Sequence, residues 1–444
     1  MGLVSSPLFV VLFSMSVLLI SMAYNLSLGY EQDFASEFTN GSTWHNVAGN
    51  VQCRPKAFHQ PSTEAELISI VKSYPHVKVV GAAHSFSPLA TVPEDGALVN
   101  LDRYNAFLKV EVLPDGSKVA IVQAGIRIYQ LDAALAARGL AISTRGAISR
   151  QSLAGVLSTA THGSSLQHGC VSSLVTRMRL IDGKGGVMEV DASHYPDVFN
   201  AARVGLGVIG IISTVTLQVE DEFYLYRDEH GVPVEDVLVA GEQLAREKDY
   251  FFWYWVPLTG IAKTFTWTRV PKEQMPGGVW YLVQRFFQAT AIRAEAAFAA
   301  VFANNPGYIY SFYGVAGHRA NVSNVLVGES SHIMEVNTLP DLKFDVEYYV
   351  PVARCKEVFD AFRGNFTVDL AKHHNIVGVF TVRYVKGDDI WMSPFYKTDT
   401  CAFDVFSSKG DGHKPEFLEF VHTLFSKFNA SSHPGKMNHL DPEV

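Results

Sequence analysis

The hydrophobic pattern near the start of the first half of the chain has helical spacing. Apolar residues between Leu67 and Val71 recur at three- and four-residue intervals, which predicts a helix. Thr63 and Glu66 form a T-x-x-E capping box at its start, and Pro75 stops it. We therefore expect a helix between Thr63 and Pro75.

The rest of this half alternates short apolar runs with turn residues. A second helix is expected over 128–138, with Gly139 in the position of a C-terminal cap glycine. The segment 182–186 lies between two apolar runs and indicates a β-hairpin. A helical stretch is also expected at 197–203. Residues 47–220 are thus expected to form one α+β domain. The predicted strands are 77–80, 97–100, 119–123, 174–181, 187–190 and 208–219.

After Glu220 the apolar runs become rich in aromatic and β-branched residues, which favour strands. An apolar-rich stretch at 279–303 is expected to be a long helix that covers a pocket or touches a membrane. Over 221–425 this pattern predicts an antiparallel sheet with helices, the plan of a substrate-covering domain, followed by a C-terminal segment at 426–444. The predicted strands are 251–255, 264–270, 346–350, 377–384 and 402–406.

Composition excludes several classes of protein. The chain has 444 residues, of which 48% are hydrophobic and 18% charged, so it can build two or more cores and is not disordered. Its net charge is −8, whereas a nucleic-acid binder shows a basic excess or a basic stripe. Its 4 cysteines are too few for a disulfide-built scaffold, and without a C-x-x-C pair they do not indicate a structural zinc site.

The N-terminus has the pattern of a targeting segment. Residues 8–23 are apolar and uncharged, short for a membrane span and typical of a secretory signal with small residues at the cleavage site. The residues before this run contain no Lys or Arg, so a retained membrane anchor stays open as the alternative. Residues 24–46 are expected to be a polar lead-in.

Five N-x-[ST] acceptors for N-glycosylation add to this picture and favour the secretory pathway, either secreted or in the ER lumen. In that compartment the four cysteines could oxidise, in three possible full pairings. The acceptors are Asn25, Asn40, Asn321, Asn365 and Asn429, and the cysteines are Cys53, Cys170, Cys355 and Cys401.

Three segments of the first domain, 80–87, 151–165 and 205–210, are expected to be loops rich in small and hydroxyl residues. Small residues let the backbone approach a bulky ligand, and their N–H groups can cradle phosphates, so the loops suggest one large phosphorylated cofactor. The third loop matches G-x-G-x-x-G. A helical stretch precedes it and a β-branched run follows, the reverse of the nucleotide-binding order, so we do not expect NAD there.

Five segments together form a specific signature over most of residues 50–436. They are VVGAAHSFSPLA (79–90), GAISRQSLAGVLSTATHGSSLQHG (146–169), DVFNAARVGLGVIGIISTVTLQ (197–218), VRYVKGDDIWMSP (382–394) and HPGK (433–436). With this set the chain resembles the aldonolactone oxidases, the group of gulonolactone and arabinonolactone oxidases, with alditol oxidases as more distant relatives. These are flavoproteins of the vanillyl-alcohol-oxidase (PCMH) type.

The resemblance implies an α+β two-domain fold that binds FAD in the first domain, with the second domain and the C-terminal segment over the flavin. It implies that His84 carries the flavin through an 8α-histidyl bond; the alternative is a loop histidine bonded to backbone. His162 either contacts the cofactor or only orients its loop. The implied cofactor-binding residues are Gly81, Ala82, Ala83, His84, Ser85, Ser152, Gly155, Ser158, Thr159, Thr161, His162, Gly163, Gly207, Ile209, Gly210 and Ile211.

The resemblance also implies a catalytic set of Arg383, Lys436 and Thr381. A fixed cation in a dry pocket would stabilise the negative charge that grows at the N1/C2=O edge of the flavin, and Arg383 and Lys436 match the family's E-x-R and H-W-x-K segments. Two departures stand out. Thr381 replaces the family's acid and cannot act as a base, which leaves His433, His374 or water.

The second departure is at the C-terminus, where HPGK lacks the family's Trp and the chain ends at Val444, earlier than relatives do. Either the sequence is truncated or the floor of the site is altered. The expected function is oxidation of a sugar-derived 1,4-lactone (gulono-, galactono- or arabinono-lactone) to an ascorbate-like product, with O₂ reduced to H₂O₂. The alternatives are an alditol (polyol) oxidase, towards which Ser152 and the SFS after His84 lean, and a flavin-binding homologue that has lost catalysis.

Overall fold

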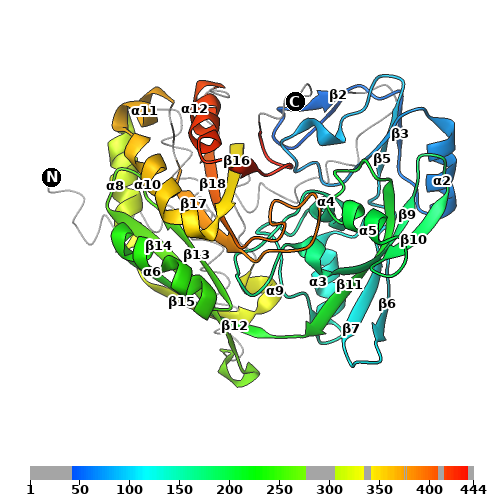
Figure 1. Ribbon diagram of the computed structural model, residues 1–444, viewed down its shortest axis with the longest axis horizontal. Coiled ribbons are helices and arrows are strands. Elements are labelled where there is room, and N and C mark those ends of the chain that lie inside the picture. Colours follow the sequence, from blue (N-terminus) through cyan, green and yellow to red (C-terminus); the bar gives the residue numbers. More distant parts are fainter. Residues whose placement is uncertain are drawn as a thin grey trace, which may run out of the picture.

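The computed structural model describes residues 43–276, 306–334, 342–374, 376, 378–408 and 415–438. The expected leader, almost all of the lead-in and the apolar stretch at 279–303 lie outside these residues. The described chain forms two halves that lie side by side (Figure 1). Within the described part, no helix is both long and apolar enough to cross a membrane.

The N-terminal half begins with a small two-stranded sheet and a three-stranded parallel sheet covered by a helix. The helix confirms Thr63 as the N-cap, because its hydroxyl accepts the Glu66 N–H at 3.2 Å, while the Glu66 carboxylate accepts the N–H of Ser62 rather than that of Thr63. Its Leu67, Ile70 and Val71 are buried. The elements are β1 (Trp44–His45), β2 (Gln52–Cys53), β3 (Ala57–His59), α2 (Glu64–Ser73), β4 (Val77–Val80), the short 3-10 turn Pro88–Ala90 and β5 (Ala97–Asn100).

A six-stranded antiparallel sheet completes this half, and its helices pack on an apolar core. The predicted hairpin is confirmed, since the strands on either side of 182–186 pair antiparallel. Gly139 has φ +66, as a cap glycine requires. Its elements are β6 (Phe107–Val112), β7 (Lys118–Gln123), α3 (Ile128–Ala136), β8 (Leu140–Ala141), α4 (Leu153–Ser158), the 3-10 turn Val171–Leu174, β9 (Val175–Ile181), β10 (Val187–Asp191), α5 (Pro196–Ala202) and β11 (Ile211–Asp221).

The strand predicted from residue 208 begins later, at Ile211. The prediction was wrong there because Gly207 (φ +71) and Gly210 (φ +143) adopt backbone conformations that a strand does not. The segment 205–210 is therefore a loop between α5 and β11, so the helix precedes and the strand follows, as the sequence indicated.

The C-terminal half is built on an eight-stranded antiparallel sheet in the order β15-β12-β14-β13-β17-β18-β16-β19. The division of the chain at 220 and 425 stays a prediction. The strands are β12 (Tyr224–Pro233), β13 (Tyr250–Trp255), β14 (Ile261–Val270), β15 (Asn324–Glu329), β16 (Leu342–Pro351), β17 (Phe380–Val385), β18 (Thr400–Ser408) and β19 (Ser431–Ser432). The helices are α6 (Val234–Glu247), α8 (Ile309–Ala320), α9 (Ser330–Ile333), α10 (Cys355–Asn365), α11 (Val368–His373) and α12 (Pro415–Ser426).

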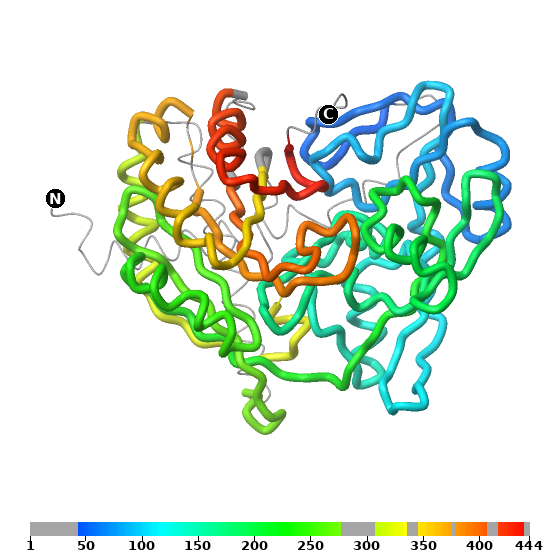
Figure 2. Tube along the Cα trace, in the orientation of Figure 1, coloured from blue at the N-terminus to red at the C-terminus, as the bar shows by residue number. Residues whose placement is uncertain are grey.

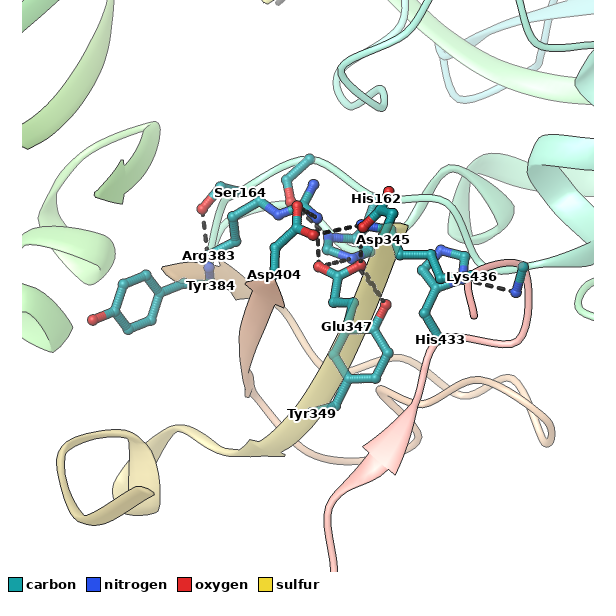
Figure 3. Close-up of polar contacts among 12 residues, drawn as sticks. His162, Ser164, Asp345, Glu347, Tyr349, Arg383, Tyr384, Asp404, His433 and Lys436 are labelled. Atoms are coloured by element: carbon teal, nitrogen blue, oxygen red, sulfur yellow. Dashed lines mark hydrogen bonds and ion pairs between the residues drawn. The ribbon is translucent and has the colours of Figure 1, made fainter. Parts of the chain in front are cut away.

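Strand alternation gives this sheet two unlike faces. In β16, Val346, Tyr348 and Val350 join the apolar core formed with α6, α8, α10 and α12. Asp345 and Glu347, which alternate with these residues along the strand, point to the other face, towards the N-terminal half (Figure 3). The helices α6, α8, α10 and α12 thus cover one side of the sheet, and charged side chains gather on the side that faces the other half.

One disulfide, Cys355–Cys401, links α10 to β18. Cys53 and Cys170 are free, so none of the three possible full pairings is formed in the structure. The three glycosylation acceptors that the structure describes are all exposed, as a modified residue must be: Asn321, Asn365 and Asn429.

Candidate active site

The register of three neighbouring strands brings charged residues together on the inner face of the sheet. Glu347 of β16 lies directly opposite Asp404 of β18, and Asp404 lies opposite Thr381 of β17. Arg383, two residues beyond Thr381, points to the same face. Its Nη2 atom lies 2.5 Å from Glu347 Oε1 and 2.9 Å from Asp404 Oδ2 (Figure 3).

Lys436 reaches the same group of side chains from the C-terminal segment. Its Nζ atom lies 2.8 Å from Asp404 Oδ1, 2.9 Å from Asp345 Oδ1 and 3.2 Å from Glu347 Oε2. We call Asp345, Glu347, Arg383, Asp404 and Lys436 the charged cluster. The structure therefore brings together the two cations that the sequence singled out.

The C-terminal segment is fixed from two sides. The N–H groups of His433 and Met437 donate to the carbonyls of Glu347 and Asp345, both at 2.9 Å, so the segment runs along β16. The carbonyl of Gly435 accepts the Phe86 N–H at 2.8 Å. Figure 2 shows this red segment crossing from α12 to the blue N-terminal half. Lys436 is thereby held beside the loop that carries His84.

His162 connects the other half to the charged cluster. Its Nδ1 lies 2.8 Å from the Gly163 carbonyl, so Nδ1–H donates there. Its Nε2 lies 3.2 Å from the Tyr349 hydroxyl and 3.3 Å from Glu347 Oε1. His162 thus orients its own loop and also contacts the cluster.

Burial and charge act in opposite directions on the carboxyl groups. Burial alone would raise the pKa of Glu347, but Arg383 and Lys436 hold it well below its ordinary value. Burial raises the pKa of Asp345 to about 8; Lys436 opposes this and the neighbouring Asp404 adds to it. Glu347 is therefore a fixed anion at neutral pH, whereas Asp345 holds a proton over much of the physiological range.

The loop after β4 is shaped by close backbone packing. A Cβ atom at Gly81 would lie 1.9 Å from Ser152 Oγ, so this position accepts only glycine without movement. Ala83 has φ +56, an uncommon conformation for a residue with a side chain. Burial and the charges of Arg127 and Arg150 lower the pKa of His84 to about 4. Its imidazole is therefore neutral at pH 7, with a lone pair on one ring nitrogen.

The predicted cofactor loops adjoin one another. The Leu206 N–H donates to the Ser158 carbonyl at 3.2 Å, and a Cβ at Gly435 would lie 3.2 Å from Thr159. The loop after β4 holds Gly81, Ala82, Ala83, His84 and Ser85. The cap and body of α4 hold Ser152, Gly155 and Ser158, and the loop after α4 holds Thr159, Thr161, His162 and Gly163. The loop before β11 holds Gly207, Ile209 and Gly210, and β11 begins at Ile211. Small residues and an imidazole with a free lone pair fit a flavin nucleotide.

The two histidines offered as proton acceptors in place of an acid at Thr381 lie in different parts of the structure. His433 lies in the site, but its Nδ1 accepts the Gly435 N–H at 2.9 Å, and burial lowers its pKa to about 3. His374 follows α11 and packs against Phe417 of α12, on the helical side of the sheet, so the structure does not bring it to the site.

Sequence reasoning missed the acidic members of the charged cluster. The signal was present in β16, where Glu347 alternates with apolar residues in the predicted strand 346–350 and Asp345 directly precedes that strand. A strand with one apolar face and two acids on the other indicates a polar site rather than a solvent face when it lies inside a large domain. Asp404 carries the same signal in β18.

Comparison with known proteins agrees with this geometry. Residues 55–191 match the family model of the FAD binding domain, and residues 215–443 match that of D-arabinono-1,4-lactone oxidase. The D-arabinono-1,4-lactone oxidase of Eremothecium gossypii is 34% identical over 255 residues, which cover 55% of this chain and 47% of the relative. The L-gulonolactone oxidase of Mus musculus is 25% identical over 413 residues and 89% of both chains.

The match to the fungal relatives is partial. It spans about half of their length, 47% for the Eremothecium gossypii protein and 41% for that of Kluyveromyces lactis, which is 38% identical over 223 residues, 48% of this chain.

Among solved structures, a cholesterol oxidase from B. sterolicum has a TM-score of 0.67 at 16% identity, covering 88% of this chain and 85% of that one. A solvent-stable cholesterol oxidase has a TM-score of 0.68 at 16% identity, covering 94% and 90%. At such identities the likeness shows the fold alone, and it confirms the expected two-domain FAD-binding fold. The match to the D-arabinono-1,4-lactone oxidase model covers more than half of this chain. The chain therefore belongs to the D-arabinono-1,4-lactone oxidase family.

Proposed function

We propose that the protein is an FAD-dependent oxidase of a sugar-derived 1,4-lactone of the gulono-, galactono- or arabinono-lactone type, with O₂ as acceptor and H₂O₂ as product. The observation that carries the proposal is the convergence of Arg383, Lys436 and His162 on the buried Glu347. When bound, FAD accepts a hydride from the substrate carbon and passes two electrons to O₂. Family membership supports both the cofactor and the substrate class.

The chain's own residues supply binding and electrostatics. The loops at 81–85, 152–163 and 205–210 would hold the nucleotide through backbone N–H groups and hydroxyls. Arg383 and Lys436 are cations in a nearly dry site, each with 15% of its side chain exposed. Cations fixed in this way stabilise negative charge that develops during the reaction without having to reorient.

Glu347 positions these cations rather than moving protons. Its side chain is fully buried, and both cations contact it. Because they hold its pKa well below the ordinary value, it stays ionised throughout the working pH range. The role that follows for Glu347 is to keep Arg383 and Lys436 side by side.

His84 is the residue we assign as the covalent attachment point of the flavin. A neutral imidazole in a loop of small residues supports this, since attachment needs a nitrogen lone pair. A carbon–nitrogen bond to the ring withdraws electron density and favours acceptance of hydride. After acid precipitation, the yellow colour of wild-type protein should stay with the polypeptide.

The matched test is His84→Ala beside the exposed His76→Ala. His84→Ala should release its flavin into the acid supernatant, while His76→Ala should retain it. Flavin that is already extractable from the wild type would overturn the covalent assignment and leave FAD binding intact.

A second candidate activity is oxidation of an alditol. The hydroxyl of Thr381 opposite Asp404 favours it, because a hydroxyl and a carboxylate side by side suit an open polyol. Peroxide release with 1,4-lactones and with alditols separates the two substrates. The intact charged cluster supports a working enzyme over a flavin-binding homologue without catalysis, for which neither substrate class would reduce the flavin.

The secretory pathway remains our proposal for location. The apolar run at 8–23, the exposed acceptors Asn321, Asn365 and Asn429, and the Cys355–Cys401 disulfide support it. Membrane association through 8–23 or 279–303 is the accompanying alternative. A glycosidase-sensitive mass and alkaline extraction of membranes test the two statements separately.

A further inference from the structure

Oxidation of an alcohol requires a group that takes the hydroxyl proton. Thr381 cannot do so near neutral pH. His433 cannot either, because its Nδ1 already accepts the Gly435 N–H and its Nε2 therefore carries the ring hydrogen. The Nε2 atom of His162 is occupied by Tyr349 and Glu347 inside the protein. Proton removal therefore falls to water or to another group on the inner face of the sheet.

Asp404 lies in the place that the substitution at Thr381 leaves without an acid. The two residues are direct partners in the β17/β18 register. Directly opposite side chains of an antiparallel pair share a face and have Cβ atoms about 5 Å apart. A carboxylate on β18 thus occupies the same row of the sheet as Thr381, beside Arg383.

Exposure separates Asp404 from Glu347. The side chain of Glu347 is fully buried, whereas 14% of the Asp404 side chain and 15% of the Asp345 side chain are exposed. Asp404 therefore lies at the open edge of the charged cluster, where a ligand can reach it. Arg383 at 2.9 Å and Lys436 at 2.8 Å fix its two oxygens.

The charges of the cluster balance when one of its carboxyl groups holds a proton. Asp345, Glu347 and Asp404 carry three potential negative charges against the two positive charges of Arg383 and Lys436. A buried excess charge is unfavourable, so the cluster gains stability by binding a proton. The raised pKa of Asp345, caused first by burial and also by Asp404, agrees with this count. Asp345 therefore holds the proton that balances the cluster, and Asp404 presents the carboxylate that a substrate hydroxyl can reach.

We propose that Asp404, paired with Asp345, receives the hydroxyl proton of the substrate, in place of an acid at Thr381. This inference rests on the proposed oxidase function. The substrate O–H bond breaks and its proton binds a carboxylate oxygen of Asp404, while the carbon-bound hydrogen leaves with two electrons as the hydride that FAD accepts. The Thr381 hydroxyl beside it donates or accepts a hydrogen bond with the substrate.

The test compares Asp404→Asn, Thr381→Glu and the double variant Thr381→Glu/Asp404→Asn, with the exposed Glu357→Gln of α10 as a matched carboxyl-to-amide control. Asp404→Asn should keep its flavin and slow anaerobic flavin reduction by about 100-fold or more, with loss of the rise in rate with pH. The double variant moves the carboxylate across the strand pair and should recover at least about 10-fold of that loss. Glu357→Gln should behave as wild type.

Two results would overturn the inference. One is Asp404→Asn reducing its flavin within about 3-fold of wild type, since a proton acceptor contributes about 10²-fold or more. The other is a slow Asp404→Asn with an unchanged pH profile and no recovery in the double variant, which is the behaviour of a structural residue. If wild type itself is reduced by no lactone or alditol, the proposed function fails instead.

A readout that does not depend on turnover covers the case in which Asp404→Asn is inactive because it is less stable. In the purified holoprotein, Asp404→Glu keeps the like charge beside Asp345, whereas Asp404→Asn removes it. The melting temperature should therefore fall more steeply between pH 5 and pH 8 in wild type and Asp404→Glu than in Asp404→Asn, over the window set by an Asp345 pKa of about 8. Equal slopes in all three would contradict the shared proton.

Discussion

The Nε2 atom of His162 lies 3.3 Å from a carboxylate oxygen of Glu347, and this contact joins the loop after α4 to strand β16. Both side chains are buried. Because Glu347 also contacts Arg383 and Lys436, the imidazole of His162 links both cations to the FAD-binding half. The two halves of the molecule thus meet at a charged site rather than at an apolar seam alone.

Replacement of His162 tests this link. In His162→Ala the two cations remain on Glu347, so the fold and the flavin should be kept. We expect kcat/KM for a lactone to fall about 10- to 100-fold, which is about 1.4–2.7 kcal/mol of lost transition-state stabilisation. Steady-state peroxide release measures this. The exposed His194→Ala is the control, and equal activity in both variants would remove His162 from the site.

Arg383→Lys separates charge from geometry. The Nη2 atom of Arg383 contacts Glu347 and Asp404 together, and a lysine ammonium at this position cannot reproduce the planar fork. We expect the fold to survive and anaerobic flavin reduction to slow by about 100-fold. Stopped-flow absorbance follows the reduction. Arg363→Lys, at an ion pair on the exposed side of α10, should leave the rate unchanged.

The raised pKa of Asp345 predicts how stability depends on pH. The folded state holds this proton up to about pH 8, whereas an unfolded Asp loses it near its ordinary value of 3.8. The stability that the proton contributes is therefore fully present below about pH 4 and is lost as pH rises through about 8. Asp345→Asn removes this dependence and leaves two carboxylates facing two cations.

We expect Asp345→Asn to melt about 1–3 °C above wild type at pH 8 and to lose the difference towards pH 4. Calorimetry over this range measures it, with the exposed Asp95→Asn as the control. A variant that melts below wild type at pH 8 would mean that Asp345 is ionised and stabilised by Lys436.

Gly81→Ala tests the packing of the loop that carries His84. The added Cβ would lie 1.9 Å from Ser152 Oγ and 2.8 Å from Ser152 Cβ, so the loop must move. Overpacking of this kind costs about 1–3 kcal/mol, and we expect a comparable loss of flavin affinity. The flavin content of purified protein reports it. Gly183→Ala, where a Cβ meets no atom within 4 Å, should retain full content.

Features with a local cause could be predicted from the sequence. The N-cap at Thr63, the cap glycine Gly139 and the hairpin at 182–186 depend on neighbouring residues only, and each is present in the structure. The start of β11 was placed too early because an apolar run does not reveal that Gly207 and Gly210 turn the backbone.

The residues of the site also divide into those that a local motif indicates and those that only the tertiary structure brings together. Arg383 and Lys436 lie in recognisable motifs, so the sequence indicated them. Glu347 and Asp404 belong to strands far apart in the chain, and only the β16/β18/β17 register makes them neighbours of each other and of Thr381. The register is set by how the apolar faces of the strands pack against α10 and α12. The sequence of a single strand does not contain this information.

The central claim is that this chain uses FAD to draw hydride from a sugar-like lactone or polyol beside Arg383 and Lys436. The most direct measurement is anaerobic mixing of the purified holoprotein with a panel of 1,4-lactones and alditols while the visible flavin absorption is followed. The account predicts bleaching by at least one of them and, on admission of O₂, recovery of the colour with one H₂O₂ formed for each flavin. Protein that takes up no flavin, or a bound flavin that no member of the panel bleaches, would contradict it.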